Sequence, residues 1–279
     1  MRIYAVYRIL YGEDFVQESI RSIEDIVDRI FVFWDDIPWG DVTSCIYKGT
    51  RVEYPVPVDN VKEKIEELKS PKIEMIYDHV KTNIGQFTHL VNDLILPNYD
   101  RPEIVFQIEP DHVFRKDQAE SLIPELESLK ESPVTTPQVV LWRVPSYHIP
   151  MINPGLMLWD LRKYKVIPPT GRHANLKGPP RRMKTFNHNL GACITARSMY
   201  WKHLLCIGFS PVIGDTLPSE SWYEEKWLGW DPLGNNADLH PSTGHESTWP
   251  KAIPYPIEEL PELIQERYGY ERVLTRTLF

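Results

Sequence analysis

Two carboxylates, Glu109 and Asp111, are the residues of this sequence best suited to chemistry, and they follow an apolar run over residues 104–108. The run is typical of a strand buried on both faces, so the two acids emerge where that strand ends. In an extended backbone, side chains two residues apart point to the same side. Two such carboxylates can share a hard divalent cation, Mg²⁺ or Mn²⁺, which keeps positions open for substrate phosphates. The alternative is a solvated acidic turn without a ligand.

Further charged side chains follow other predicted strands. Apolar runs over residues 3–7, 30–34 and 73–77 alternate with segments whose apolar residues recur at helical spacing. This order predicts an α/β fold, in which right-handed crossovers build a mainly parallel central sheet flanked by helices. The charged residues at the strand ends are Arg8, Asp35, Asp36 and Asp78. Because ligands bind beyond the carboxyl ends of parallel strands, we expect these side chains to meet the two motif carboxylates at one edge.

The second half of the sequence is less regular. Residues 145–189 are rich in proline and arginine, which predicts a long loop or lid around one short apolar piece. A predicted strand over residues 191–196 and a predicted helix over residues 198–205 precede an acidic, aromatic stretch. The candidates for an aromatic platform under a sugar or base are Trp222, Trp227, Trp230 and Trp249. Core packing is the more frequent use of tryptophan and remains the alternative.

Charge and composition argue against several classes of function. The net charge of −8 does not suit a general binder of nucleic acid or membrane surfaces, which needs a basic surface. The three cysteines are far apart and show no CxxC spacing, which favours a reducing compartment over a disulfide framework. No apolar run is long enough to cross a bilayer. We therefore expect a cytoplasmic protein without a transmembrane segment.

Short motifs, taken in chain order, resemble those of the A-fold glycosyltransferases, in particular the broad family-2-like group of nucleotide-sugar enzymes. The resemblance covers about residues 2–231. The matching pieces are residues 18–23 in the first helix, Asp35-Asp36, Asn83-Ile84-Gly85 with Asn92, Glu109-Pro110-Asp111 in place of the family's Asp-x-Asp, and Gly208-Phe209 before Glu224-Glu225.

The resemblance implies one A-type, Rossmann-like domain over residues 1–279. It implies a nucleotide-binding half over about residues 1–115 and an acceptor half over about residues 116–279, with the proline- and arginine-rich loop near residues 145–189. The implied reaction is metal-dependent transfer of a sugar from a nucleoside diphosphate sugar to an acceptor hydroxyl, with Mn²⁺ or Mg²⁺ as the cation. A saccharide is the expected acceptor, and a protein, a lipid or a modified nucleic acid stays open.

The resemblance also implies roles for single residues. The expected nucleotide-binding residues are Tyr7, Arg8, Asp35, Asp36, Asp78, Asn83, Gly85 and Glu109. The expected metal ligands are Glu109, Asp111 and the late histidine His245, with His240 and His188 as alternatives. The expected general base of an inverting transfer is Glu224 or Glu225, with Asp215 behind them. We expect His112 to turn into the sheet edge rather than toward a metal.

Two other functions stay open. A nucleotidyltransferase that makes nucleotide-sugars uses a similar sheet, but it needs a glycine-rich basic loop after the first strand, where residues 8–14 contain only Gly12. A non-catalytic module that binds a nucleotide-sugar or a glycan would keep the fold without the chemistry. The glutamate at position 109 would then mark the loss of activity.

Overall fold

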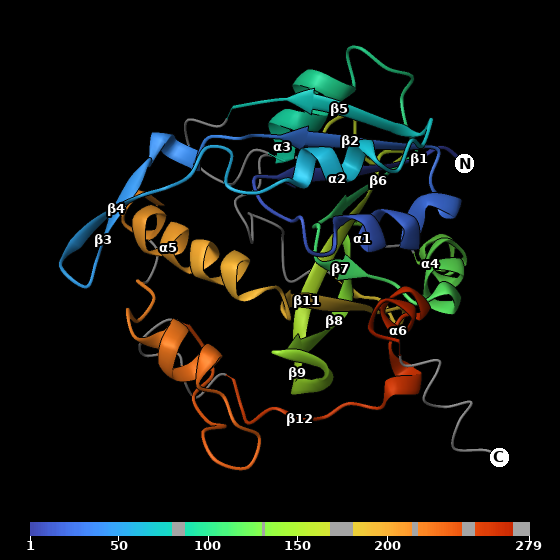
Figure 1. The fold of residues 1–279 in the computed structure, drawn as a ribbon. Coiled ribbons are helices and arrows are strands. Elements are labelled where there is room, and N and C mark those ends of the chain that lie inside the picture. The colour runs from blue at the N-terminus through green and yellow to red at the C-terminus, as the bar shows by residue number, and fades with distance from the viewer. Residues whose placement is uncertain (80–86, 130–131, 168–180, 214–216, 242–248, 270–279) are drawn as a thin grey trace.

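The structure is a computed structural model that describes residues 1–79, 87–129, 132–167, 181–213, 217–241 and 249–269. Its centre is one mixed sheet (Figure 1), whose strands from edge to edge are β5 (Ile73–Tyr77), β2 (Arg29–Trp34), β1 (Ile3–Ile9), β6 (Ile104–Ile108), β9 (Val144–Asp160), β8 (Val134–Trp142), β11 (Asn187–Ala192) and β7 (His112–Val113). Two short strands complete it, β10 (Arg181–Arg182) beside β8 and β12 (Ile253–Pro254) beside β9. A separate hairpin consists of β3 (Ser44–Tyr47) and β4 (Thr50–Glu53).

The first four strands of this order, β5, β2, β1 and β6, run parallel to one another. Tyr7 of β1 lies opposite Val32 on one side and Ile108 on the other, so these strands end close together. The predicted α/β class, a mainly parallel sheet flanked by helices, is confirmed. The edge at which Arg8 and Glu109 emerge is therefore the carboxyl edge of parallel strands, where ligands bind.

Strand β9 corrects the expectation of a loop over residues 145–189. It runs antiparallel between β6 and β8, with Leu158 opposite Phe106 and Ile149 opposite Val140. The β8–β9 register shifts at several points, because prolines cannot donate to a regular ladder and are accommodated at bulges. Strand β11 begins at Asn187, earlier than the strand predicted over residues 191–196. Residues 168–180 of the expected loop lie outside the described part of the chain.

The helices cover both faces of the sheet. They are α1 (Val16–Ile23), α2 (Val61–Glu66), α3 (Phe87–His89), α4 (Lys116–Ser128), α5 (Ala196–Ile213) and α6 (Glu262–Tyr268), with the π-helical segments η4 (Leu90–Ile95) and η5 (Tyr223–Leu228) and the 3-10 turns η1 (Glu24–Ile26), η2 (Trp39–Asp41) and η7 (Ile257–Glu259). None of the helices in the described part of the chain is long and apolar enough to span a membrane.

Alternation along β1 divides its side chains between two cores. Tyr7 and Ile9 face the core that α1, α2 and α4 build on one side of the sheet. Tyr4 and Val6 face the core on the other side, which α3 and η4 cover. Arg8 follows Val6 with the period of two, so its side chain lies on the second side. The sheet thus places Tyr7 and Arg8 on opposite faces.

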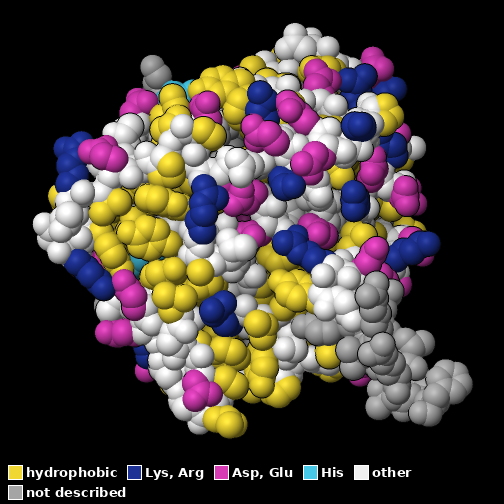
Figure 2. Space-filling view, in the orientation of Figure 1, with side chains coloured by type: hydrophobic (Ala, Val, Ile, Leu, Met, Phe, Trp, Pro, Cys, Tyr) yellow, Lys and Arg dark blue, Asp and Glu magenta, His cyan; other side chains and the backbone are white. Residues whose placement is uncertain are grey.

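Helix α5 packs against the β3–β4 hairpin rather than against the parallel strands. The hydroxyl of Tyr54 donates to the carbonyl of Leu204 at 2.8 Å, and Cys45 and Tyr47 join the same apolar cluster. On the face shown in Figure 2, hydrophobic side chains gather over the hairpin and α5, whereas charged side chains are interspersed over α1, α2 and α4. The hairpin therefore holds α5 in place from outside.

Candidate active site

A cavity of about 420 Å³ lies beyond the ends of β1 and β6, and α5 bounds its other side. Both halves of the chain supply its polar wall. The first half contributes Arg8, Glu109 and Asp111, and the second half contributes Asn189, Lys202 and His203. The carboxyl edge of the sheet thus faces α5, which comes almost a hundred residues later in the sequence.

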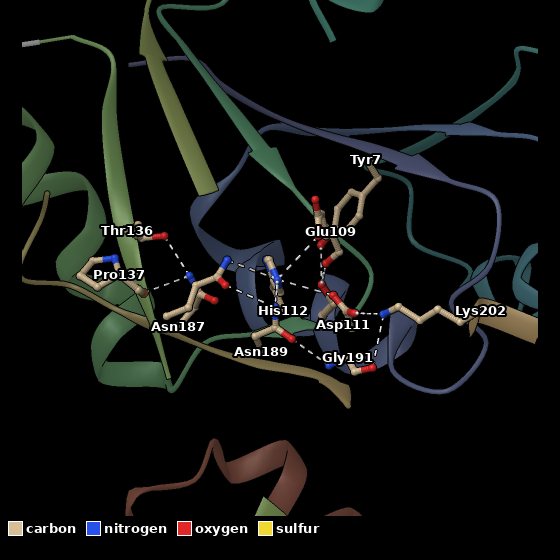
Figure 3. Close-up of polar contacts among 12 residues, drawn as sticks. Tyr7, Glu109, Asp111, His112, Thr136, Pro137, Asn187, Asn189, Gly191 and Lys202 are labelled. Carbon is tan, nitrogen blue, oxygen red and sulfur yellow. Dashed lines mark hydrogen bonds and ion pairs between the residues drawn. The ribbon is translucent and has the colours of Figure 1, made fainter. Parts of the chain in front are cut away.

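Glu109 and Asp111 lie on the tight turn between β6 and β7, which the His112 N–H closes by donating to the Glu109 carbonyl at 3.1 Å. One ligand atom from each of Glu109, Asp111 and His112 lies within 4.8 Å of the others (Figure 3). His112 Nε2 is 3.5 Å from Asp111 Oδ1 and 3.8 Å from Glu109 Oε2. The two predicted metal ligands are therefore side by side, and His112, which was expected to turn away, joins them.

Lys202 of α5 contacts the other oxygen of Asp111. Its Nζ lies 3.4 Å from Asp111 Oδ2 and 3.3 Å from the carbonyl oxygen of Gly191. Burial raises the pKa of Asp111, but the Lys202 ammonium outweighs burial and holds that pKa below its usual range. Burial lowers the pKa of Lys202, and Asp111 more than reverses this effect, so the pKa lies above its usual range. Both groups are therefore charged at neutral pH.

Asn189 determines where His112 carries its proton. The Gly191 N–H donates to Asn189 Oδ1 at 2.8 Å, so the amide nitrogen of Asn189 faces His112 Nε2, also at 2.8 Å. That nitrogen is a donor, and it donates to Gln138 Oε1 at 3.3 Å as well. Nε2 of His112 accepts and therefore carries a lone pair. The Asn189 amide thus uses the Nε2 lone pair, and a cation could bind Nε2 only in place of this hydrogen bond.

Gly191 is required by this arrangement because a side chain there would enter it. A Cβ atom at position 191 would lie 2.4 Å from Asp111 Oδ2 and 3.0 Å from both Asn189 Oδ1 and Lys202 Nζ. No unstrained side chain fits at such distances. Glycine at this position therefore allows the three polar groups to meet.

Tyr7 is not placed in the cavity. Its side chain is fully buried in the core on the opposite face of β1, and its hydroxyl lies 3.0 Å from Ser19 Oγ. Ser19 Oγ in turn donates to the carbonyl of Glu109 at 3.1 Å. Burial raises the pKa of Tyr7 well above its usual range. The expectation that Tyr7 binds the nucleotide is wrong for its side chain, which instead supports the acidic turn from behind.

Arg8 lines the cavity as expected, and two of the predicted acids, Asp78 and Asp35, are close enough to affect its pKa. Burial lowers the pKa of Arg8, while Asp78 and Asp35 raise it. One carboxylate oxygen of Asp78, Oδ2, is buried and has no hydrogen-bond partner among the described residues. Asp36 lies further out and accepts a hydrogen bond from the Tyr77 hydroxyl at 3.1 Å. The three acids meet at the predicted edge, but the described wall of the cavity does not include them.

Asp35 belongs to a chain of carboxylate, imidazole and carboxylate that runs from the interior to the exposed Asp41. Its Oδ2 lies 2.8 Å from His79 Nδ1, and His79 Nε2 lies 2.8 Å from Asp41 Oδ1. Burial lowers the pKa of His79, but the two carboxylates raise it above its ordinary value. Asp35 Oδ1 also accepts from the Ile37 N–H at 2.9 Å. The side chain of Asp35, only 2% exposed, is thus held by the loop after β2.

The two glutamates expected to act as the base lie away from the cavity. Glu224 Oε1 accepts from the Tyr47 hydroxyl at 2.6 Å and from Lys48 Nζ at 2.9 Å, so Glu224 faces the β3–β4 hairpin. Burial raises the pKa of Glu224, but these two partners hold it below its usual range. Glu225 is exposed on η5. Neither lines the cavity, so the structure does not support the expectation of a base at either position.

Other predicted site residues are placed elsewhere. Asn83, Gly85, Asp215 and His245 lie outside the described residues. His188 is fully buried, with its Nε2 2.9 Å from the Tyr255 hydroxyl, and it does not line the cavity. The ring of His240 packs edge-on against Trp249, with 5.0 Å between centroids.

Two of the four candidate tryptophans line the cavity. Trp222 and Trp249 stand edge-on to Trp142, with ring centroids 6.1 Å and 5.8 Å away, and all three rings form part of the wall. Trp227 is fully buried, and Trp230 donates to Asn236 Oδ1. Core packing therefore explains Trp227 and Trp230, while the other pair belongs to an aromatic wall.

Sequence reasoning missed three polar residues of the site, His112, Asn189 and Lys202. For Lys202 a signal exists, because Lys202, His203 and Cys206 recur at helical spacing within an otherwise apolar helix. For Asn189 the only signal is its place in a polar strand next to Gly191. Asn189 is recognised as a site residue only when the pairing of β11 with β7 is known, because this pairing places Asn189 opposite His112.

No protein-family model and no curated protein sequence matches the chain. Among solved structures, the chain is similar to S. aureus TarS 1-349 in complex with UDP-GlcNAc, with 9% identity and a TM-score of 0.40 over 89% of this chain and 78% of that chain. It is also similar to the 4-diphosphocytidyl-2C-methyl-D-erythritol synthase of Anaerococcus prevotii DSM 20548, with 9% identity and a TM-score of 0.38 over 71% of this chain and 95% of that chain. Because these values are low, the functional assignment rests on the geometry of the site.

Proposed function

We propose that the protein is a glycosyltransferase that moves a sugar from a nucleoside diphosphate sugar to an acceptor hydroxyl, with Mn²⁺ or Mg²⁺ in its site. The observation that carries this proposal is the convergence of Glu109, Asp111 and His112 on a cavity that Arg8 and Lys202 also line. Carboxylates and imidazole suit a divalent cation. Guanidinium and ammonium groups suit the phosphates that such a cation would accompany.

The donor set fits a divalent cation. Asp111 Oδ1 is buried and has no hydrogen-bond partner among the described residues, which is costly unless a ligand satisfies it. His112 Nε2 lies 3.5 Å from that oxygen and could bind a cation in place of the Asn189 N–H, and the half-exposed Glu109 side chain can turn toward both. A cation held by these three residues would neutralise charge on the diphosphate leaving group.

The remaining charged residues of the cavity bind and orient the donor. Arg8 places a guanidinium at the end of β1, close enough to Asp35 and Asp78 for both to raise its pKa. Lys202 places a second positive charge beside Asp111. These two positive charges would hold a diphosphate between the sheet and α5.

Both halves of the chain share this work. We assign nucleotide binding to residues up to about 115 and acceptor binding to the later residues, because the tryptophan rings that line the cavity all belong to the second half. A ring face is wide and apolar and complements the apolar face of a sugar. A saccharide is therefore the proposed acceptor.

The loop after β1 counts against a nucleotidyltransferase. Such an enzyme uses free backbone N–H groups to cradle a triphosphate. Here Asp59 Oδ2 already accepts from the N–H groups of Gly12 and Glu13, at 2.7 Å and 3.0 Å. A Cβ at Gly12 would lie 2.6 Å from the Pro110 side chain, so the glycine serves packing against the acidic turn.

A thermal-shift titration tests the proposal. The titration uses the wild type, the site variants Asp111→Asn and Glu109→Gln, and the exposed control Asp25→Asn. Each protein is mixed with one of five nucleoside diphosphates, UDP, GDP, CDP, ADP or dTDP, with and without Mn²⁺. We expect one diphosphate to raise the melting temperature of the wild type and the control only when Mn²⁺ is present. We expect both site variants to lose this shift. Failure of every diphosphate at millimolar concentration would contradict the proposal and favour a binding module.

A further inference from the structure

The proposed transfer requires a group that takes the proton of the acceptor hydroxyl. Glu224 and Glu225 lie outside the cavity, and Glu109 and Asp111 are occupied in holding the cation. A further basic side chain on the described wall is His203 of α5. It stands one residue after Lys202, on the side of α5 that also presents Met199 to the cavity.

One ring nitrogen of His203 forms a hydrogen bond, and the other has no hydrogen-bond partner among the described residues. The ring donates to the backbone carbonyl of Glu220. Nε2 is buried and has no hydrogen-bond partner among the described residues, so Nδ1 is the donor and Nε2 keeps its lone pair. The side chain is only 3% exposed. An unpartnered acceptor this deeply buried on a cavity wall indicates a ligand that completes it.

Three aromatic rings from two elements fix the position of His203. Trp222 and Tyr223 lie against it, with ring centroids 5.6 Å and 6.3 Å away, and Tyr47 of the hairpin approaches edge-on at 6.0 Å. The indole of Trp222 is itself held, because its Nε1–H donates to the Leu239 carbonyl at 2.8 Å. A base held this rigidly is already oriented before the substrate binds.

A second unused polar atom lies on the same wall. Trp142 lines the cavity and is fully buried, and its Nε1–H has no hydrogen-bond partner among the described residues. Trp222 and Trp249 flank it on the wall. One free acceptor and one free donor among apolar rings complement a ligand with several hydroxyl groups and an apolar ring face.

We propose that this aromatic part of the cavity is the acceptor subsite and that His203 Nε2 takes the proton of the reacting hydroxyl. The inference rests on the proposed function and deepens it. The acceptor oxygen forms a bond to the anomeric carbon of the donor, and the bond from that carbon to the diphosphate oxygen breaks. The diphosphate leaves with the bonding electron pair, the hydroxyl proton moves to Nε2, and His203 later releases that proton to water.

The charges around His203 agree with this role. The titratable side chains that face it are Tyr47 and Lys48 of the hairpin, and Glu220, Tyr223 and Glu224 of the segment around η5. Burial lowers the pKa of His203, Glu224 and Glu220 oppose this effect, and the net pKa is below the ordinary value. The imidazole is therefore neutral at neutral pH and can accept a proton.

Two replacements of His203 separate basicity from hydrogen bonding. His203→Asn keeps a donor near Nδ1 and leaves nothing at Nε2, whereas His203→Gln keeps a polar amide atom near Nε2 that is not basic. The assay measures release of the diphosphate from the nucleotide-sugar that matches the thermal-shift result, from pH 5 to 9. The probe acceptors are methyl glucoside, methyl galactoside and methyl N-acetylglucosaminide. The control is the exposed His89→Asn.

We expect the wild type and the control to lose activity at a pH lower than the ordinary histidine value of about 6.5, because burial lowers the pKa at which His203 becomes protonated. We expect both His203 variants to be slower by about 100-fold or more, to lack this acid limb, and to keep the Mn²⁺-dependent thermal shift. His203→Gln should retain a KM for the glycoside close to that of the wild type, and His203→Asn should raise it.

The possible failures are distinguishable. Wild-type rate and an unchanged acid limb in His203→Asn, with nucleotide binding intact, overturn the inference and leave the proposed function standing. Absence of nucleotide binding in the wild type overturns both. If His203→Asn lowers the melting temperature too far, Trp142→Phe tests the subsite, because it keeps the ring and removes the Nε1–H. A raised KM for the glycoside with the acid limb retained supports the inference, and an unchanged KM overturns it.

Discussion

Lys202 Nζ lies 3.4 Å from Asp111 Oδ2, and this contact joins α5 to the acidic turn across 91 positions of the chain. The carboxylate that the proposed cation would use therefore already has a fixed positive partner. Lys202 holds the pKa of Asp111 down against the effect of burial, so the acid stays ionised in a site that is largely closed to water. The same ammonium would contact the diphosphate of the proposed donor. One lysine would thus connect the proposed metal site and leaving group to the position of α5.

Lys202→Met tests this link. We expect the free energy of unfolding to fall by about 2 kcal/mol, less than the roughly 3–5 kcal/mol of a fully buried pair, because both side chains are partly exposed. Mn²⁺ should bind more tightly, since Asp111 no longer shares its charge, and diphosphate should bind more weakly. Urea unfolding and calorimetric titration measure these changes. The exposed Lys62→Met, which removes a pair with Glu66 at 3.8 Å, should change neither. Unchanged Mn²⁺ affinity in Lys202→Met would contradict the proposal that Lys202 shares the charge of Asp111 with the cation.

Gly191→Ala tests the packing of the site. The new Cβ would displace the ends of Asp111, Asn189 and Lys202, which are side-chain atoms that can move, so the variant should fold with a loss of about 1–3 kcal/mol. The Mn²⁺-dependent affinity for diphosphate should fall by about tenfold or more, which is about 1.4 kcal/mol. The matched control is Gly234→Ala, whose Cβ would lie 2.9 Å from Asp231 Oδ2 on the surface. Equal nucleotide affinity in the two variants would show that the site does not require glycine at position 191.

His188 predicts a pH dependence of stability. Burial, assisted by Arg115, lowers the pKa of His188 to about 3, whereas an unfolded histidine takes up a proton near pH 6.5. Between these values the unfolded chain binds one more proton than the folded chain, so stability falls as the pH falls, by up to about 1.4 kcal/mol per pH unit. In His188→Phe this part of the slope should disappear, while the exposed His89→Asn should retain it. Urea unfolding at pH 4.5, 5.5 and 6.5 provides the comparison, and equal slopes for wild type and His188→Phe would contradict the prediction.

Glu224→Gln distinguishes the structural role of this acid from a catalytic one. Its partner Lys48 is 53% exposed and Glu224 is 39% exposed, so the ion pair contributes about 1 kcal/mol or less. We expect a small fall in melting temperature and no change in the turnover of the nucleotide-sugar, because Glu224 does not line the cavity. A large loss of turnover with the melting temperature retained would return the base role to Glu224.

Part of the fold could be predicted because its signals are local. The apolar runs and helical spacings of the first half repeat within short windows, so strands, helices and their alternation follow from the sequence. The handedness of crossovers then brings the residues after β1 and β6 to one edge, so the meeting of Arg8, Glu109 and Asp111 is predictable as well. Strand β9 was missed because prolines interrupt its alternation, and its bulged pairing with β8 accommodates them without a regular local pattern.

Local sequence patterns are thus sufficient for the strands of the first half and for the acids at their carboxyl edge. The surroundings of those acids depend on tertiary packing. Asn189 reaches His112 through a strand register, Lys202 reaches Asp111 because the hairpin holds α5, and Glu224 turns away because Tyr47, 177 positions earlier, binds it. Contacts at such separations depend on how completed elements pack, and no short window of sequence encodes that packing.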